Sequence, residues 1–134
     1  MLSEKQKQKL LKLAAEARAQ AYAPYSKYAV GAALLADNGK YYSGANIENA
    51  AYPSSMCAER VAIFKAVSEG VRRLQGLAVV TINGGSPCGG CRQVICEFAQ
   101  QDLSVLIGNI EGKLILETAL AELLPHSFGP EDLN

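Results

Sequence analysis

The sequence lacks an excess of charge of either sign, because thirteen lysine and arginine residues balance thirteen aspartate and glutamate residues. A basic surface that would hold a nucleic-acid polymer is therefore not expected. No hydrophobic run is long enough to span a bilayer, so we expect no membrane partner. The first residues, MLSEKQ, also lack the hydrophobic stretch of a secretory signal. We therefore expect a cytoplasmic protein with a small, weakly charged ligand.

Histidine is nearly absent, since His126 is the single example and follows Pro125 in a predicted loop. We expect it to be solvated or loosely packed rather than a metal ligand. Cysteine is present at four positions, 57, 88, 91 and 96. In a reducing compartment, closely spaced cysteines more often bind metal or perform redox chemistry than form structural disulfides.

With 134 residues, 49% of them hydrophobic, the chain can bury a core without disulfides, which predicts a single domain over residues 1–134.

Hydrophobic periodicity and turn signals divide the chain into alternating helices and strands. Ser3 and Gln6 resemble a capping box at the start of a helix that ends before Pro24. We predict strands over residues 28–36, 40–46, 77–82, 103–107 and 113–116, and further helices over 57–69, 88–100 and 118–124. Strand–helix–strand order in the middle favours parallel pairing, whereas the first hairpin is antiparallel. The sequence therefore predicts an α/β fold with a mixed five-stranded sheet covered by helices.

Cys88 and Cys91 stand three residues apart where a helix is expected to begin, in the sequence SPCGGC. This spacing brings both thiols within reach of one metal ion, and a helix N-terminus favours the thiolate form. A redox pair occupies the same strand-to-helix position in thioredoxin-like folds. The pair alone leaves metal binding and redox chemistry open.

Cys57 provides a third thiol at a second predicted helix start, and Glu59 follows two residues later. Three thiolates with an open fourth position are typical of a catalytic zinc site, whereas structural zinc sites have four protein ligands. Cys96 lies more than a turn beyond Cys91, so we interpret it as a free buried cysteine. Residues two apart do not share a helix face, which leaves Glu59 free for proton transfer.

Cys57-Ala58-Glu59 followed by Pro87-Cys88-x-x-Cys91 resembles the zinc deaminase signature. The three-cysteine form is similar to the small oligomeric cytidine deaminases. That resemblance implies a three-layer α/β/α fold. It extends over nearly the whole chain, through residues 23–28 (APYSKY), 44–52 (GANIENAAY), 92–94 (RQV) and 123–125 (LLP).

The resemblance implies hydrolytic deamination of cytidine and deoxycytidine to uridine and deoxyuridine, with release of ammonia, in pyrimidine salvage. One Zn²⁺ per chain would be held by Cys57, Cys88 and Cys91. Glu59 would take a proton from the attacking water and deliver protons to N3 and the leaving amine of the pyrimidine. Arg60 would donate hydrogen bonds to the thiolates and offset their charge.

The resemblance also implies a substrate-binding set and a homotetramer with shared active sites. Within that set, Asn46 and Glu48 would hold the ribose, and Tyr28 and Phe128 would border the base. Ala50, Tyr52 and Phe128 match positions that contact a ligand in an adjacent subunit. Two departures stand out, because Tyr28 replaces the usual phenylalanine and the loop before Pro87 is short. The complete predicted set is Tyr28, Asn46, Glu48, Ala50, Tyr52, Ala58 and Phe128.

Several alternatives fit parts of the pattern. Deamination of another cytosine compound, including a nucleoside antibiotic such as blasticidin, would use the same metal signature. A non-catalytic zinc module would need the metal only for folding. A redox enzyme would form a reversible disulfide between Cys88 and Cys91 without depending on Cys57.

Overall fold

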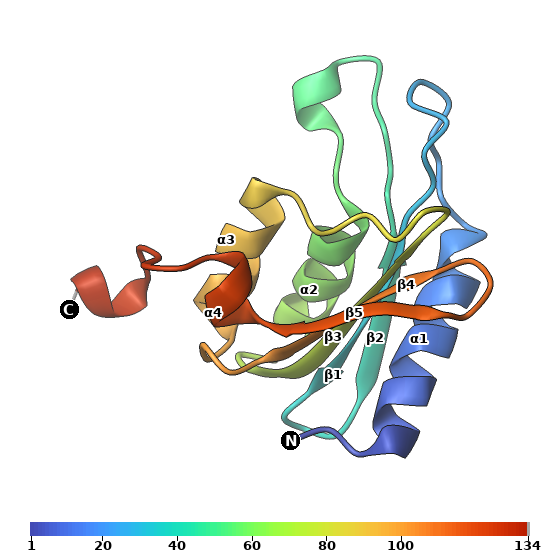
Figure 1. Ribbon diagram of the computed structural model, residues 1–134. Coiled ribbons are helices and arrows are strands. Elements are labelled where there is room, and N and C mark those ends of the chain that lie inside the picture. Colours follow the sequence, from blue (N-terminus) through green and yellow to red (C-terminus); the bar gives the residue numbers. More distant parts are fainter. Residues whose placement is uncertain (134) are drawn as a thin grey trace.

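The computed structural model describes residues 1–133, which form one five-stranded sheet with helices on both faces (Figure 1). The order of helices and strands matches the order predicted from the sequence. In chain order the elements are α1 (Glu4–Arg18), β1 (Gly31–Ala36), β2 (Tyr41–Ala45), the 3₁₀ helix η1 (Tyr52–Ser54), α2 (Ala58–Ser68), β3 (Leu74–Thr81), α3 (Gly89–Phe98), β4 (Ser104–Asn109), β5 (Leu114–Ala119), α4 (Leu120–Leu123) and the 3₁₀ helix η2 (Pro130–Leu133).

The sheet is mixed, as predicted, with strand order β2-β1-β3-β4-β5. β3 and β4 are parallel, and α3 makes the crossover between them. The other neighbouring strands are antiparallel, including the β1–β2 hairpin. This topology places the start of α3 beyond the carboxyl end of β3, next to the start of α2.

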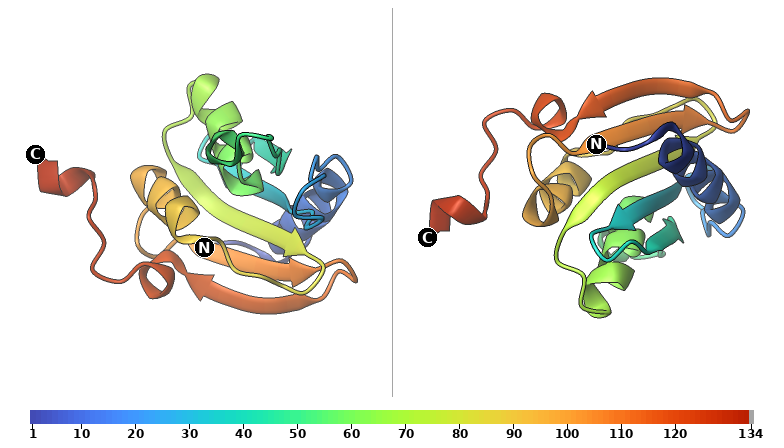
Figure 2. Two further views of the ribbon diagram at one scale, coloured as in Figure 1. Left: turned by 90° about the horizontal axis from the view of Figure 1, so that it is seen from above. Right: turned by 90° about the horizontal axis from the view of Figure 1, so that it is seen from below.

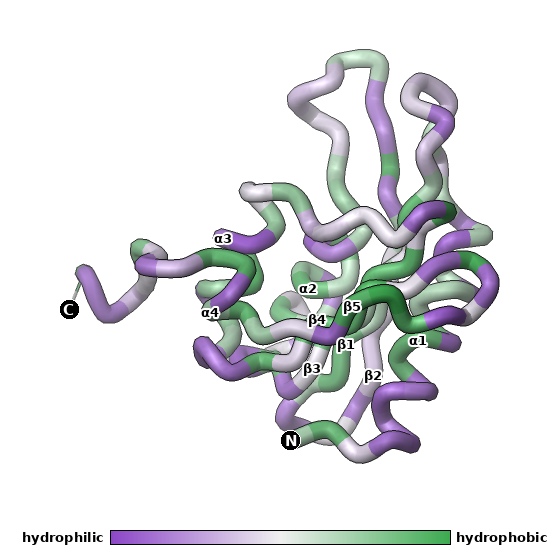
Figure 3. Tube along the Cα trace, in the orientation of Figure 1, coloured by the Kyte–Doolittle hydropathy of each residue, from purple (hydrophilic) through white to green (hydrophobic). Residues whose placement is uncertain are grey.

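Alternating side chains of the central strands supply two hydrophobic cores, one on each face of the sheet. In β3, Leu77 and Val79 pack in the core that contains residues of α2 and α3, whereas Val80 packs with residues of α1. The views in Figure 2 show α1 on one face and α2 and α3 on the other, which confirms three α/β/α layers. Hydrophobic residues gather in the strands, whereas the C-terminal end is largely hydrophilic (Figure 3).

α1 begins with the predicted capping box. The backbone N–H of Gln6 donates to Ser3 Oγ at 3.1 Å, and the backbone N–H of Ser3 donates to Gln6 Oε1 at 2.9 Å. The helix lies so close to β1 that a Cβ at Gly31 would be 1.9 Å from the carbonyl oxygen of Ala14. Glycine at position 31 is therefore required for this packing.

Several boundaries differ from the prediction. The first strand starts at Gly31 instead of residue 28, because the Asn46 amide binds the backbone there, accepting from Val30 N–H and donating to the Tyr28 carbonyl. β3 starts at Leu74, since the sheet pairing with β1 extends further than the hydrophobic run suggested. β5 continues through residues predicted as helix, up to Ala119, because they pair with the start of β4.

Two segments extend beyond the sheet on the side where α2 and α3 begin (Figure 1). They are residues 19–30 and 46–57, and single bridges join Tyr22 to Ile47 and Ile47 to Met56.

Within residues 1–133, no helix has the length and hydrophobicity that a bilayer crossing requires.

Candidate metal centre and active site

Three thiols from two helix starts converge at this end of the sheet. Cys57 is the N-cap residue of α2, Cys88 is the N-cap residue of α3, and Cys91 lies in the first turn of α3. The Sγ atoms of Cys57 and Cys88 are 3.9 Å apart, and those of Cys88 and Cys91 are 3.4 Å apart. Among residues 1–133, this is the group of side chains arranged to hold a metal ion.

The spacing of the sulfur atoms fits zinc. With Zn–S bonds of about 2.3 Å in a tetrahedron, ligand sulfurs lie about 3.8 Å apart. All three sulfurs lie within 4.8 Å of one another. Three soft thiolates also form a donor set that zinc prefers, and they leave one tetrahedral position for a non-protein ligand.

The surroundings favour thiolates at this centre. The pKa of Cys57 is lowered to about 5, chiefly by hydrogen bonding with the Cys91 thiol and also by the charge of Arg60. The same hydrogen bond and burial raise the pKa of Cys91, so that one thiol holds a proton while its neighbour is ionised. Arg60 Nη2 lies 3.5 Å from Cys57 Sγ and 4.0 Å from Cys88 Sγ. Together with two helix N-termini, this cation offsets the negative charge of the sulfurs.

A cavity of about 290 Å³ opens beside the thiols. The part of the chain that the structure describes has three buried polar side chains, Asn46, Glu59 and Thr81, and all three line this cavity. Glu59 is 4% exposed, and its burial raises the pKa of its carboxyl group, with a further contribution from the Cys57 charge. A carboxyl group with a raised pKa is suited to accept and return a proton.

Asn46 and Glu48 follow β2 and line the same cavity, as their spacing predicted. Each also fixes the protein backbone. The Glu48 carboxylate accepts from the backbone N–H groups of Tyr25 and Ser26, both at 3.0 Å, and from the Ser26 hydroxyl. These bonds, the Ser26 hydroxyl first, lower the pKa of Glu48. The carboxylate and the amide each retain capacity for a further hydrogen bond to a ligand.

Similarity to known proteins agrees with this site. Residues 4–107 match the family described as the cytidine and deoxycytidylate deaminase zinc-binding region. The chain belongs to this family. The cytidine deaminase of Sporosarcina psychrophila is 54% identical over 129 residues, which cover 95% of this chain and 94% of that protein. The cytidine deaminase of Halalkalibacterium halodurans is 50% identical, over 96% of this chain and 98% of the relative.

The fold agrees with a solved structure of a cytidine deaminase. The crystal structure of the Burkholderia pseudomallei enzyme superposes with a TM-score of 0.85 at 40% identity, and the match covers 95% of this chain and all of that one. The α/β fold predicted from the sequence is therefore confirmed as the fold of this deaminase family.

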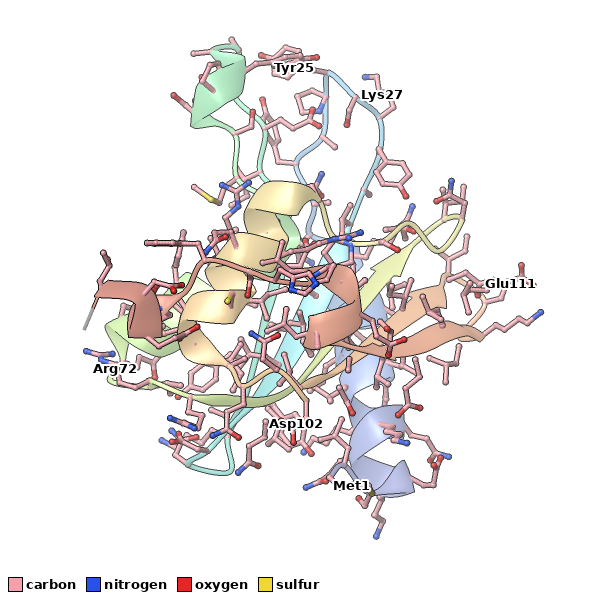
Figure 4. The ribbon with its side chains drawn as sticks, turned by 60° about the vertical axis from the view of Figure 1, so that its left-hand side comes forward. Met1, Tyr25, Lys27, Arg72, Asp102 and Glu111 are labelled. Carbon is pink, nitrogen blue, oxygen red and sulfur yellow. The ribbon has the colours of Figure 1, made fainter. Side chains whose placement is uncertain are left out.

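Three residues predicted to contact substrate do not line the cavity of their own chain. Phe128 is 59% exposed, Tyr52 is 63% exposed, and Ala50 is also exposed. Tyr52 forms an edge-to-face contact with Tyr25 at 5.9 Å, at the far end of the molecule from Met1 and Asp102 (Figure 4). A larger hollow of about 630 Å³ next to Met1 and Asp102 contains none of the three thiols.

Cys96 and His126 both lie outside the three-thiol cluster. Cys96 is buried, with Sγ 3.4 Å from Ser127 Oγ, and is not part of the thiol cluster, as expected for a free cysteine. His126 is exposed in a loop, also as expected.

Sequence reasoning did not identify Thr81, Gly85 and Ser86 as cavity residues. The strand–loop–helix order before Cys88 indicates that these three residues lie near the thiol cluster. No sequence motif identifies them as cavity residues.

Proposed function

We propose that this chain catalyses the zinc-dependent hydrolytic deamination of cytidine and deoxycytidine to uridine and deoxyuridine. The observation that carries the proposal is the common cavity of the thiol centre and a buried carboxyl group. Cys57 and Cys88 line it together with Glu59, and Cys91 completes the cluster. The two relatives named above, which match nearly the full length of this chain, are cytidine deaminases.

Cys57, Cys88 and Cys91 would hold one Zn²⁺ per chain. When bound there, zinc supplies Lewis-acid activation of a water molecule. Glu59 is placed to accept one proton from the attacking water while the water oxygen adds to C4 of the pyrimidine, and to deliver that proton to N3. It then accepts the second proton, from the hydroxyl group formed on C4, and delivers it to the amine, which leaves as ammonia while the oxygen stays on C4 as the carbonyl. Burial raises the pKa of the Glu59 carboxyl group above its ordinary value, which favours its carrying a proton between water and substrate.

The other cavity residues orient the nucleoside. Asn46 and Glu48 offer a donor and an acceptor for the hydroxyl groups of the sugar. The ring of Tyr28 provides an aromatic surface at the base, and the buried Ala58 lies where the backbone enters α2 next to Glu59. Together, these residues hold C4 of the pyrimidine near the carboxyl group of Glu59.

We also propose a homotetramer in which Ala50, Tyr52 and Phe128 complete a neighbouring active site. Their exposure, and their absence from the cavity of their own chain, support this arrangement. β5 adds an exposed hydrophobic stripe that a neighbouring subunit would cover, formed by Leu114, Ile115 and Leu116. A cytoplasmic location and a role in pyrimidine salvage complete the proposal, because the free thiols of the centre require a reducing compartment.

The decisive variant is Glu59→Gln, which keeps the size of the side chain and removes its capacity to accept a proton. We expect zinc content and circular dichroism to be unchanged, while cytidine turnover falls by about 10²–10⁴-fold. Glu69→Gln, at an exposed glutamate just after α2, is the matched control and should keep full turnover. Turnover in Glu59→Gln equal to that of the Glu69→Gln control would contradict the assigned role. A zinc-free protein with a Cys88–Cys91 disulfide would favour redox chemistry.

A further inference from the structure

A hydrogen-bonded link joins Tyr28 to the loop between β3 and α3. The Tyr28 hydroxyl donates to Asn83 Oδ1 at 2.6 Å, and the Thr81 hydroxyl donates to the same oxygen at 3.3 Å. Thr81 Oγ1 in turn accepts from the backbone N–H of Gly85 at 2.8 Å. Thr81 is 2% exposed, so its hydroxyl depends on these protein partners.

Gly85 is the point at which the loop touches the tyrosine. A Cβ at this position would lie 2.5 Å from the Tyr28 hydroxyl oxygen, and the next nearest atoms would be 3.7 Å away. The Tyr28 hydroxyl oxygen therefore lies against the Gly85 backbone, and any side chain at position 85 would displace this oxygen. Gly85 and Ser86 line the cavity, and the loop continues through Pro87 into Cys88.

The Tyr28 hydroxyl group thus binds the 83–86 loop at Asn83, and Gly85 and Ser86 of this loop line the cavity that Tyr28 also lines.

We propose that Tyr28 is a positioning residue that, through Asn83 and Gly85, holds the 83–86 loop as a fixed wall of the substrate cavity. This inference rests on the proposed function for its substrate, but the link itself is a property of the fold. The wall borders the base, whereas Glu59 and Cys57 are held at the start of α2, outside this loop. The hydroxyl group therefore acts mainly on KM.

The first test removes the hydroxyl group. Tyr28→Phe should raise KM for cytidine by about 2- to 10-fold, as expected for loss of one neutral hydrogen bond, with a smaller change in kcat and unchanged zinc content. Asn83→Ala should raise KM at least as much as Tyr28→Phe does, because Asn83 Oδ1 also accepts from Thr81, and adding Tyr28→Phe to Asn83→Ala should raise KM no further. The control is Tyr22→Phe, which removes a hydroxyl from an exposed ring and should leave KM unchanged.

The second test uses the contact with Gly85 and needs no activity. Gly85→Ala should lower the melting temperature of the zinc-loaded protein when residue 28 is tyrosine, because the new methyl group displaces the hydroxyl. In the Tyr28→Phe background the nearest ring carbon is at ordinary contact distance, so the same change should have little effect. Equal effects of Gly85→Ala in both backgrounds, or an unchanged KM in Tyr28→Phe, would overturn the proposal.

The two proposals fail separately. Coupling of Gly85→Ala to residue 28 in a protein that does not deaminate cytidine would support the link and overturn the proposed function. Full deamination without this coupling would overturn the link alone.

Discussion

Arg60 Nη2 lies 3.5 Å from Cys57 Sγ and 4.0 Å from Cys88 Sγ, so one guanidinium group faces thiols from two different helix starts. Three thiolates around Zn²⁺ carry a net negative charge, and Arg60 is the side chain that the structure places against them. The position of this cation connects the sequence motif Cys-Ala-Glu-Arg to the electrostatics of the centre.

Replacing Arg60 should weaken the metal centre. We expect Arg60→Gln to lower zinc affinity by about 10–100-fold, because partners of metal ligands have effects of this size. Competition with a chelator measures the affinity. Arg73→Gln removes the same charge from an exposed position and should have no effect. Equal zinc retention in both variants would show that Arg60 does not stabilise the thiolates.

The four cysteines should separate into two classes. Serine at position 57, 88 or 91 should abolish stoichiometric zinc binding, because each removes one of three thiolate ligands. Cys96→Ala should keep zinc and turnover, since Cys96 contacts Ser127 and lies outside the cluster. Measuring the zinc content per chain of the four purified variants tests this division. Loss of zinc in Cys96→Ala with the fold intact would contradict the assigned ligand set.

In the zinc-free protein, the thiols should differ in reactivity. The pKa of Cys57 is lowered to about 5, chiefly by hydrogen bonding with Cys91, whereas the pKa of Cys91 is raised. Cys57 is therefore a thiolate at neutral pH, and an alkylating reagent should label it before Cys91. Peptide mass analysis should show a Cys57 rate that is nearly constant from about pH 6 to pH 8. A rate that rises about tenfold per pH unit, as for an ordinary thiol, would contradict the lowered pKa.

Glu48 should order the loop that carries Tyr25 and Ser26. Glu48→Gln should raise KM for cytidine and speed tryptic cleavage after the exposed Lys27, because the neutral amide keeps only one of the two oxygens that accept the loop's hydrogen bonds. The pKa of Glu48 is lowered, so these bonds are present at neutral pH and are lost as pH falls through that lowered pKa. Glu16→Gln, at a glutamate of α1, is the control. Identical cleavage rates in the two variants would refute this role.

The sequence was sufficient to predict the order of elements and the cluster of three thiols. Periodicity and turn residues defined the elements, and cysteines at two helix starts predicted a shared metal centre that the structure confirms as a cluster. Strand ends were less predictable, because pairing with a neighbour extended β3 back to Leu74 and β5 on to Ala119.

Contacts between distant segments could not be predicted. The Tyr28–Asn83 hydrogen bond joins residues 55 positions apart and leaves no periodic signal in the sequence. Asn46 and Glu48 were predicted to face the ligand, but their bonds to the backbone of residues 25–30 depend on how the loop folds around them. Both cases involve polar side chains that fix irregular backbone, for which hydrophobic patterns carry no information.

The most direct test of hydrolytic deamination follows the oxygen atom. The zinc-loaded protein is incubated with cytidine in heavy-oxygen water, and ammonia and nucleoside products are quantified by enzymatic assay and mass spectrometry. We expect one ammonia for each uridine formed, one heavy oxygen on the uracil ring, and at least about 100-fold slower formation of both products by Glu59→Gln. Unchanged cytidine, or uridine without the heavy oxygen, would contradict hydrolytic deamination.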